Sequence, residues 1–189
     1  ALLRMDFMES CVRLTKSPFY NKPMILMLWQ KALIETFYSF TMARESKDMG
    51  IWIDRFKRLL LLIARKNTKS ETTSALAMSE FIVGPQGADI VAASNDDAQS
   101  SIVYDAIDMM RQLIDPNDLD TKRNQRFILN KSTNTKVFKL SDRTNNKEGR
   151  NIDFAIVDES HEMKENIIGK SIEQSQSLKD NPKFVNITT

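Results

Sequence analysis

Cysteine and histidine are almost missing from this sequence of 189 residues, which contains one of each. Because a single cysteine, Cys11, cannot form an intrachain disulfide, a disulfide framework is excluded and a reducing compartment is expected. The lone His161 lies beside Glu162 and completes no set of zinc ligands. The sequence therefore predicts neither a disulfide scaffold nor a zinc centre.

Long apolar runs are missing as well. Leu59 to Ala64 is followed at once by Arg65 and Lys66, and it falls far short of the roughly 20 apolar residues that cross a bilayer. We therefore expect no membrane-spanning segment and no membrane partner. Neither sign of charge dominates, since 27 basic residues stand against 25 acidic ones. Any contact with nucleic acid has to be local.

The pattern of apolar residues predicts an α/β domain with a helical N-terminal extension. Two helical stretches, Leu2 to Leu14 and Met24 to Met42, enclose a loop that contains Pro18 and Pro23. After Lys57, short apolar runs alternate with amphipathic stretches, a pattern typical of a parallel sheet with helical crossovers. These segments are Arg58 to Ala64, Ser70 to Val83, Asp89 to Ala93, Asp96 to Ile114, Ile152 to Val157, Ser160 to Lys179 and Lys183 to Ile187.

One segment interrupts this alternation. Arg126 to Leu129 and Lys136 to Leu140 flank the turn-rich residues 130–134. Two short apolar runs around such a turn predict a β-hairpin, which we expect to be inserted at an edge of the sheet.

The first candidate for chemistry is the polar turn that follows the run Leu59 to Ala64 and ends in Lys69-Ser70. A strand, a turn and a helix in this order can cradle phosphate, because backbone N–H groups and the helix dipole attract anions. Lys69 would reach the β and γ phosphates and the Ser70 hydroxyl would bind Mg²⁺. The turn lacks the glycines of the usual pattern, and the alternative is that Ser70 only caps the helix.

The second candidate is the pair Asp158-Glu159 at the end of the predicted strand Ile152 to Val157. Ligands of open α/β sheets bind at the carboxyl ends of the strands. Asp158 would help to hold Mg²⁺, and Glu159 would polarise an attacking water. The alternative is that both acids merely begin the next helix, where the helix dipole favours them. The order and spacing of the two candidates together favour an ATPase site.

Four stretches resemble the ATPase domain of tailed-phage large terminases. Residues 64–70 resemble the family's deviant nucleotide loop, and residues 158–162 are similar to its Asp-Glu-x-His-Glu run. Residues 28–30 resemble its Pro-Trp-Gln segment, with Leu28 in place of the proline. Residues 186–189 resemble its coupling motif.

The resemblance implies a P-loop NTPase fold of the RecA or ASCE type and a role for each matching residue. Residues 1–50 would form the helical extension with the adenine-side motif, residues 51–189 the ATPase core, and the family's nuclease domain would be absent from this chain. The implied nucleotide-binding residues are Trp29, Gln30, Lys66, Asn67, Thr68, Lys69 and Ser70. Those implied for Mg²⁺ are Ser70 and Asp158, those for catalysis Glu159, Lys69 and Arg65, and those for coupling Thr188 and Thr189. Arg143 and Arg150 are candidate arginine fingers toward a neighbouring subunit.

The activity implied by the resemblance is hydrolysis of ATP, with Mg²⁺, to move double-stranded DNA into a procapsid. Its partners would be the DNA, the portal protein, the small terminase subunit and neighbouring large-terminase subunits in a ring, and its place the host cytoplasm and, transiently, the procapsid portal. Thr68 departs from the family's glycine, and a β-branched residue resists a tight loop. Two alternatives remain at this point: a helicase-like nucleic-acid translocase, and a nucleotide-binding assembly module with little hydrolysis.

Overall fold

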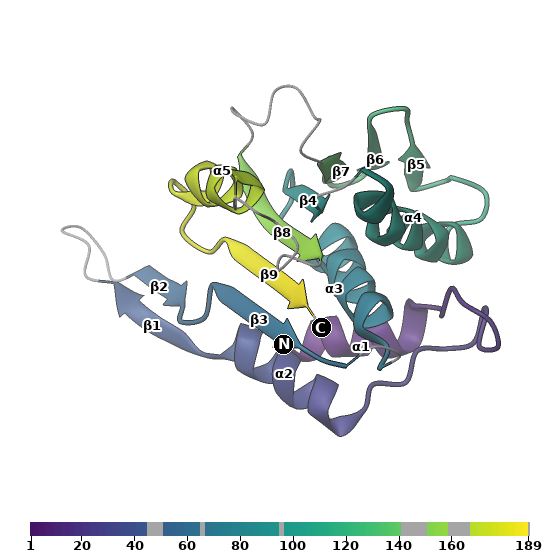
Figure 1. Ribbon diagram of the computed structural model, residues 1–189, viewed down its shortest axis with the longest axis horizontal. Helices are drawn as coiled ribbons and strands as arrows, with labels where there is room; N and C mark the ends of the chain where they lie inside the picture. The colour runs from purple at the N-terminus through teal and green to yellow at the C-terminus, as the bar shows by residue number, and fades with distance from the viewer. Residues whose placement is uncertain (45–50, 65–66, 95–96, 141–150, 159–166, 189) are drawn as a thin grey trace.

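A computed structural model describes residues 1–44, 51–64, 67–94, 97–140, 151–158 and 167–188 (Figure 1). The helices are α1 (Leu2–Cys11), α2 (Leu28–Ser39), α3 (Lys69–Val83), α4 (Asp97–Ile114) and α5 (Ile167–Gln176). The strands are β1 (Thr41–Arg44), β2 (Ile51–Asp54), β3 (Arg58–Leu62), β4 (Asp89–Ser94), β5 (Thr121–Arg123), β6 (Phe127–Asn130), β7 (Lys136–Leu140), β8 (Ile152–Asp158) and β9 (Lys183–Thr188).

Seven strands form one sheet in the order β3-β9-β8-β4-β7-β6-β5. The strands from β3 to β7 in this order run parallel, and β6 and β5 are antiparallel to their neighbours. The mainly parallel sheet predicted from the alternating pattern is confirmed. Strand β9, the last in the described sequence, lies between β3 and β8, so the strands that lead to the two candidate motifs are separated by one strand.

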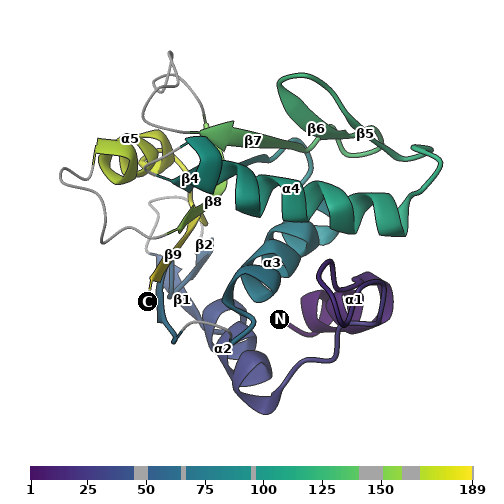
Figure 2. The ribbon, with the colours of Figure 1, turned by 45° about the vertical axis from the view of Figure 1, so that its right-hand side comes forward.

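Helices cover both faces of this sheet. Because side chains alternate along a strand, Phe154 and Ile156 of β8 pack with α1, α3 and α4, whereas Ala155 and Val157 pack with α5. Figure 2 shows α3 and α4 on one side of the sheet and α5 on the other. None of the helices in the described part of the chain has the length and apolar character of a membrane span.

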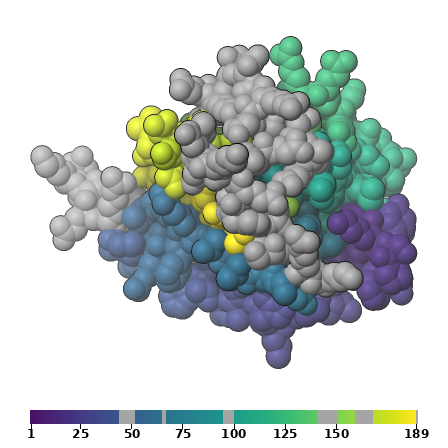
Figure 3. All heavy atoms as spheres, viewed as in Figure 1, coloured from purple at the N-terminus to yellow at the C-terminus, as the bar shows by residue number. Residues whose placement is uncertain are grey.

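The N-terminal helices pack against the helix that follows β3. The Arg4 guanidinium pairs with the Glu80 carboxylate of α3 at 2.8 Å, and the Thr15 hydroxyl donates to Glu71 of α3 at 2.5 Å. In the space-filling view the N-terminal segment, in purple, lies against the green end of α4 (Figure 3). A pocket of about 370 Å³ at this contact is lined by Tyr20 and residues of α4.

The predicted extents of the first two helices were wrong at their ends. Helix α1 ends at Cys11 and not at Leu14, and α2 covers Leu28–Ser39 within the predicted Met24 to Met42. After α2 the backbone becomes extended at Phe40, whose carbonyl accepts the Arg55 N–H at 2.8 Å. Strand β1 then pairs antiparallel with β2 in a separate two-stranded sheet. Short apolar runs fit a helix or a strand equally well, and pairing decides between them.

The predicted edge hairpin is confirmed as β6 and β7, but β5 was missed. Three residues are too few to show an alternating pattern. The turn before β5 depends on Asp115, whose carboxylate accepts backbone N–H groups of Leu119, Asp120 and Thr121 at 2.8–3.0 Å. Burial opposes ionisation of this carboxyl, but the donors outweigh it and lower the pKa of Asp115 to about 2. The last helix, predicted over Ser160 to Lys179, is described only as α5, because residues 159–166 lie outside the described residues.

Candidate functional site

The candidate site lies where four parallel strands end. Leu62 of β3 is paired with Thr188 of β9, and Asp158 of β8 is paired with both Ile187 of β9 and Ser94 of β4. These pairings place the carboxyl ends of the strands along one edge of the sheet, where open α/β sheets bind ligands. The backbone N–H of Ile63, the first residue after β3, donates to the Thr188 carbonyl at 3.3 Å. The coupling residue expected from the sequence therefore contacts the start of the nucleotide loop.

Helix α3 begins at Lys69, directly after a residue in a left-handed conformation. Thr68 has φ 56° and ψ 17°, a region that a β-branched residue adopts at a cost of roughly 1–2 kcal/mol. Its side chain makes no capping hydrogen bond to α3, and its hydroxyl donates instead to the Asn67 carbonyl at 2.7 Å. The conformation expected of the family's glycine is thus present, and the Thr68 side chain does not cap the first turn of α3.

Lys69 and Asp158 face each other across this edge. Asp158 follows Phe154 and Ile156 on the face of β8 that packs on α3, so its carboxylate points toward the start of that helix. The Lys69 ammonium lies 3.7 Å from an Asp158 oxygen, and both residues are over nine-tenths buried. A direct charge-assisted hydrogen bond is shorter, about 2.7–2.9 Å. A buried cation and a buried anion are thus held close together at the end of the sheet without a direct hydrogen bond.

The oxygen atoms at this edge fit Mg²⁺. Ser70, the second residue of α3, is half-buried and carries a hydroxyl, and the carboxylate of Asp158 lies next to its neighbour Lys69. Magnesium ions in phosphate-transfer sites take one or two protein oxygens and complete their shell with water and phosphate. Across the described residues no cluster of three His, Cys, Asp or Glu side chains is suited to a metal. A Mg²⁺ ion held by these two oxygens would take the rest of its shell from water and phosphate.

A pocket of about 270 Å³ lies beside the loop. Its lining residues are Met27, Trp29, Ile63, Asn67 and Thr68. Trp29 is 38% exposed, and its indole N–H donates to the Met27 sulfur at 3.3 Å. An apolar pocket with an aromatic wall next to a phosphate loop can hold a flat base. Trp29 therefore lies in the wall of a pocket next to the loop, and its contact with adenine stays a prediction.

Gln30 is buried behind the loop and is absent from the lining of this pocket. Its amide nitrogen donates to the Thr72 hydroxyl at 2.6 Å and to the Thr68 hydroxyl at 3.5 Å. Its carbonyl oxygen accepts the Met27 N–H at 2.7 Å, at the start of α2. Sequence reasoning missed Thr72 and Met27. The spacing of four residues between Thr68 and Thr72 was an available signal, because such residues share one face of a helix.

The structure thus brings most of the described site residues to one edge. Trp29 and Gln30 lie next to the loop residues Asn67 and Thr68. Ser70 and Thr188 lie near the pair Lys69 and Asp158. The remaining predicted residues lie outside the described residues: Arg65, Lys66, Arg143, Arg150, Glu159 and Thr189.

Comparison with protein families gives one match over most of the chain. Residues 29–189 match the family "Terminase large subunit, ATPase domain". A comparison with curated proteins finds no match.

Solved structures with a similar fold are phage terminases. The HK97 bacteriophage large terminase matches all of this chain with a TM-score of 0.81 and 20% identity. The large terminase ATPase domain of Thermus phage P74-26 covers 72% of the chain, with a TM-score of 0.59 and 20% identity. The large terminase of the thermophilic bacteriophage D6E covers 87%, with a TM-score of 0.57 and 9% identity. The chain spans 37%, 62% and 39% of these three proteins, respectively.

Proposed function

Because the chain belongs to the family of terminase large subunit ATPase domains, we propose that it hydrolyses ATP to move double-stranded DNA into a procapsid. The observation that carries the proposal is the buried pair of Lys69 and Asp158, 3.7 Å apart at the start of α3. Family membership supports an ATPase in general and favours a terminase over a helicase-like translocase. The division into an extension, residues 1–50, and an ATPase core, residues 51–189, is part of the same proposal, with nuclease activity assigned to no residue of this chain.

Each residue has a defined part in the proposed reaction. The first N–H groups of α3 and the Lys69 ammonium bind the phosphates, and Arg65 adds positive charge. Ser70 and Asp158 would hold Mg²⁺, which would neutralise phosphate charge. Glu159 accepts a hydrogen bond from the attacking water and aligns it with the γ phosphorus. The cleaved bond is the one between the γ phosphorus and its bridging oxygen.

Recognition of the base belongs to the pocket beside the loop. Trp29 offers an aromatic face, and Asn67 and Thr68 offer polar groups in the pocket lining. Lys66, in the same loop of the sequence, would add positive charge for the phosphates. Thr188, with Thr189, would couple nucleotide hydrolysis to movement of the chain. The Thr188 carbonyl accepts the N–H of Ile63, which directly precedes the nucleotide loop.

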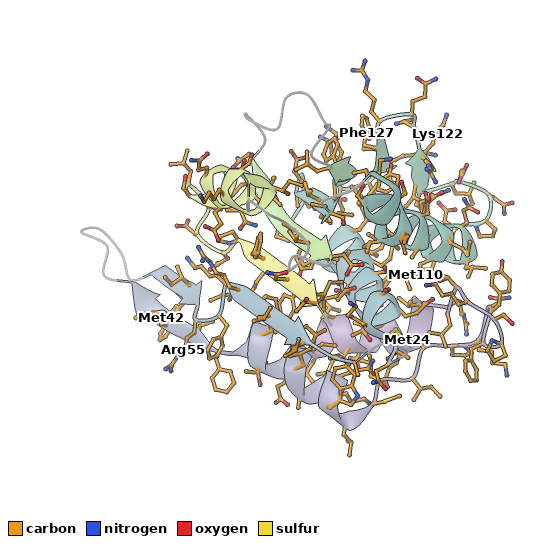
Figure 4. The ribbon with its side chains drawn as sticks, in the orientation of Figure 1. Met24, Met42, Arg55, Met110, Lys122 and Phe127 are labelled. Carbon is orange, nitrogen blue, oxygen red and sulfur yellow. The ribbon has the colours of Figure 1, made fainter. Side chains whose placement is uncertain are left out.

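The DNA partner is supported by a local excess of positive charge. Residues 121–140, from β5 to β7, contain Lys122, Arg123, Arg126, Lys131, Lys136 and Lys139 and no acidic residue. The total charge of the chain is nearly balanced, so this positive segment is the part that would be attracted to the phosphates of DNA. Lys122 and Phe127 mark this edge of the molecule in Figure 4. The portal protein and the small terminase subunit are proposed partners on family grounds.

Neighbouring subunits of a ring are proposed to complete the site. Arg143 and Arg150 precede β8, and either would supply positive charge to the γ phosphate of an adjacent subunit. Arginines supplied in this way raise rates by roughly 10³–10⁵. Turnover per chain should then rise steeply with protein concentration, and Arg143→Ala or Arg150→Ala should abolish that rise without loss of ATP binding. Fast turnover by a proven monomer would contradict the ring.

The decisive experiment compares ATP binding and hydrolysis in the wild type and in Glu159→Ala. The variant should bind ATP nearly as well as the wild type and lose hydrolysis, because this carboxylate acts on water and not on the bound nucleotide. Equal loss of binding would show that Glu159 has another role. If the wild type itself binds no nucleoside triphosphate, the proposed function is wrong.

A further inference from the structure

We propose that Thr15 is a positioning residue of the nucleotide site, which holds the Glu71 carboxylate away from the nucleotide loop. The inference rests on the proposed function and gives the N-terminal segment a part in it. If it is correct, the contact between Thr15 and Glu71 keeps the backbone N–H of Thr68 available to a phosphate.

The sequence at the start of α3 fits a pattern that would block this N–H. Thr68 and Glu71 have the spacing of a capping box, Ser/Thr-x-x-Glu. In a capping box the Thr68 hydroxyl would accept the Glu71 N–H, and the Glu71 carboxylate would accept the Thr68 N–H. A carboxylate at this position would occupy a donor of the phosphate loop and would repel the phosphate. The capping box and a bound triphosphate would therefore compete for one place.

Both members of this pattern make other contacts in the structure. The Thr68 side chain does not cap α3, and its hydroxyl donates to the Asn67 carbonyl at 2.7 Å. The Glu71 carboxylate accepts the Thr15 hydroxyl at 2.5 Å and the Thr15 N–H at 3.3 Å. Thr68 also has a φ of 56°, whereas a capping residue has extended backbone angles. The capping box that the sequence offers is thus not formed.

Thr15 is held in place by the rest of the N-terminal segment. The N–H of its neighbour Leu14 donates to the Lys22 carbonyl at 2.9 Å, which closes the loop around Thr15. Arg4 of α1 pairs with Glu80 near the other end of α3. The segment therefore contacts α3 at both ends, and Thr15 is fixed relative to the nucleotide loop.

Glu71 needs such a partner because its side chain is buried. Glu71 and Thr15 are each only 8% exposed. A buried carboxylate without a hydrogen bond is costly, so loss of the Thr15 hydroxyl would drive Glu71 toward another donor. The Thr68 N–H is the donor that the capping-box spacing offers. Thr15 therefore decides between two contacts of one carboxylate.

The test measures the affinity of wild type and variants for ATP and for inorganic tripolyphosphate, each with Mg²⁺. Thr15→Val should weaken both ligands by a factor of about 10, because one charge-assisted hydrogen bond is lost and fewer sites are open. Thr15→Ser keeps the hydroxyl and should stay within about twofold of the wild type. Glu71→Ala, alone or combined with Thr15→Val, should also bind within about twofold of the wild type, because the competing carboxylate is gone.

This rescue separates the positioning role from a purely structural one. If the contact only supported the fold, Glu71→Ala and the double variant should lose as much affinity as Thr15→Val. That result, in protein shown to be folded by circular dichroism, would overturn the proposal.

A ligand-free measurement separates this inference from the proposed function. In Thr15→Val the Thr68 amide should exchange hydrogen more slowly than in the wild type, because the Glu71 carboxylate then accepts it. Thr15→Ser should keep the wild-type rate, and unchanged exchange in β4 and β8 shows that the fold is intact. Unchanged or faster exchange of Thr68 in folded Thr15→Val refutes the inference even if no nucleotide binds. If Glu71→Ala does not fold, this measurement decides the question.

Discussion

Two buried lysines lie at opposite ends of the same sheet and are held in different ways. Lys183 begins β9, and its ammonium contacts the carbonyls of Phe37 and Phe56 at 2.7 Å and the Asp54 carboxylate at 3.0 Å. Lys69 begins α3 at the carboxyl edge, and its ammonium lies 3.7 Å from Asp158. Both residues are less than one-tenth exposed. Burial of a lysine therefore does not by itself identify a site.

The surroundings of Lys183 explain a structural role. Its three contacts account for the three donors of an ammonium. They join Phe37 of α2 to Asp54 of β2 and to Phe56, which lies between β2 and β3. Burial lowers the pKa of Lys183, although the hydrogen bond to Asp54 acts in the opposite direction. The ammonium also lies 4.4 Å from the centre of the Phe37 ring. Its charge is thus matched by groups that belong to the fold.

The surroundings of Lys69 differ in kind. It follows a residue with positive φ, stands at the positive end of a helix dipole and faces a carboxylate beyond hydrogen-bonding distance. At the amino edge the chain matches a buried charge with close partners. At the carboxyl edge Lys69 stands at the start of a helix and close to Asp158, and we propose that it binds a phosphate there.

The contrast between Lys69 and Lys183 is tested most directly by Lys69→Ala. We expect ATP affinity to fall about 100-fold or more, because removal of a desolvated charge that contacts phosphate costs roughly 2–5 kcal/mol of binding. The melting temperature should also fall, because the buried Asp158 carboxylate loses this cation, so affinity is compared on the folded fraction of the same samples. An unchanged dissociation constant would remove Lys69 from the site.

Lys183→Met should lower the stability of the fold and leave ATP binding intact. It leaves the Asp54 carboxylate and two carbonyls without their cation, and we expect a loss of about 2 kcal/mol in the free energy of unfolding. Denaturant unfolding gives this value. ATP affinity of the folded fraction should stay within about twofold of the wild type, so the variant is also the matched control for Lys69→Ala. A stable Lys183→Met that no longer binds ATP would reverse the assignment of the two lysines.

A smaller effect is expected for Thr68→Gly. Relief of the left-handed conformation gains roughly 1–2 kcal/mol, while glycine gives back about 0.4–1 kcal/mol through backbone entropy. The free energy of unfolding should therefore rise by between about 0 and 1.6 kcal/mol. ATP binding should be preserved or tightened, because Thr72 still holds the carbonyl of residue 68. A folded variant with weaker ATP binding would give the Thr68 hydroxyl a larger part in the site than its 3.5 Å contact with Gln30 suggests.

The smallest effect is a dependence of stability on pH that comes from Lys183. Its pKa in the folded chain lies below the ordinary lysine value of 10.5. Between these two values the unfolded chain binds more protons, so the free energy of unfolding should rise with pH in that alkaline window. The Lys183→Met variant should lack this rise. Urea unfolding at several pH values compares the slopes, and equal slopes would show that Lys183 titrates normally in the folded chain.

Much of the fold could be predicted where a segment is long and its pattern regular. The strand ending at Val157 and the helix from Ser70 to Val83 were placed within one residue of β8 and α3. The strands β1, β2 and β5 escaped prediction, because three or four residues carry no clear periodicity and depend on a partner for their pairing. For the same reason the end of α2 was extended into β1.

The order of residues along the chain determined which groups can serve this protein: a lysine and a serine at a helix start, a carboxylate at a strand end, and a tryptophan and a glutamine upstream. Only the tertiary structure decided that Lys69 faces Asp158 across a sheet in which β9 separates their strands. It also decided that the Gln30 amide donates to Thr72. Local sequence sets helix starts and turn chemistry within a few residues. Contacts between residues 30 and 72, or 69 and 158, depend on packing of the whole core, which no local pattern encodes.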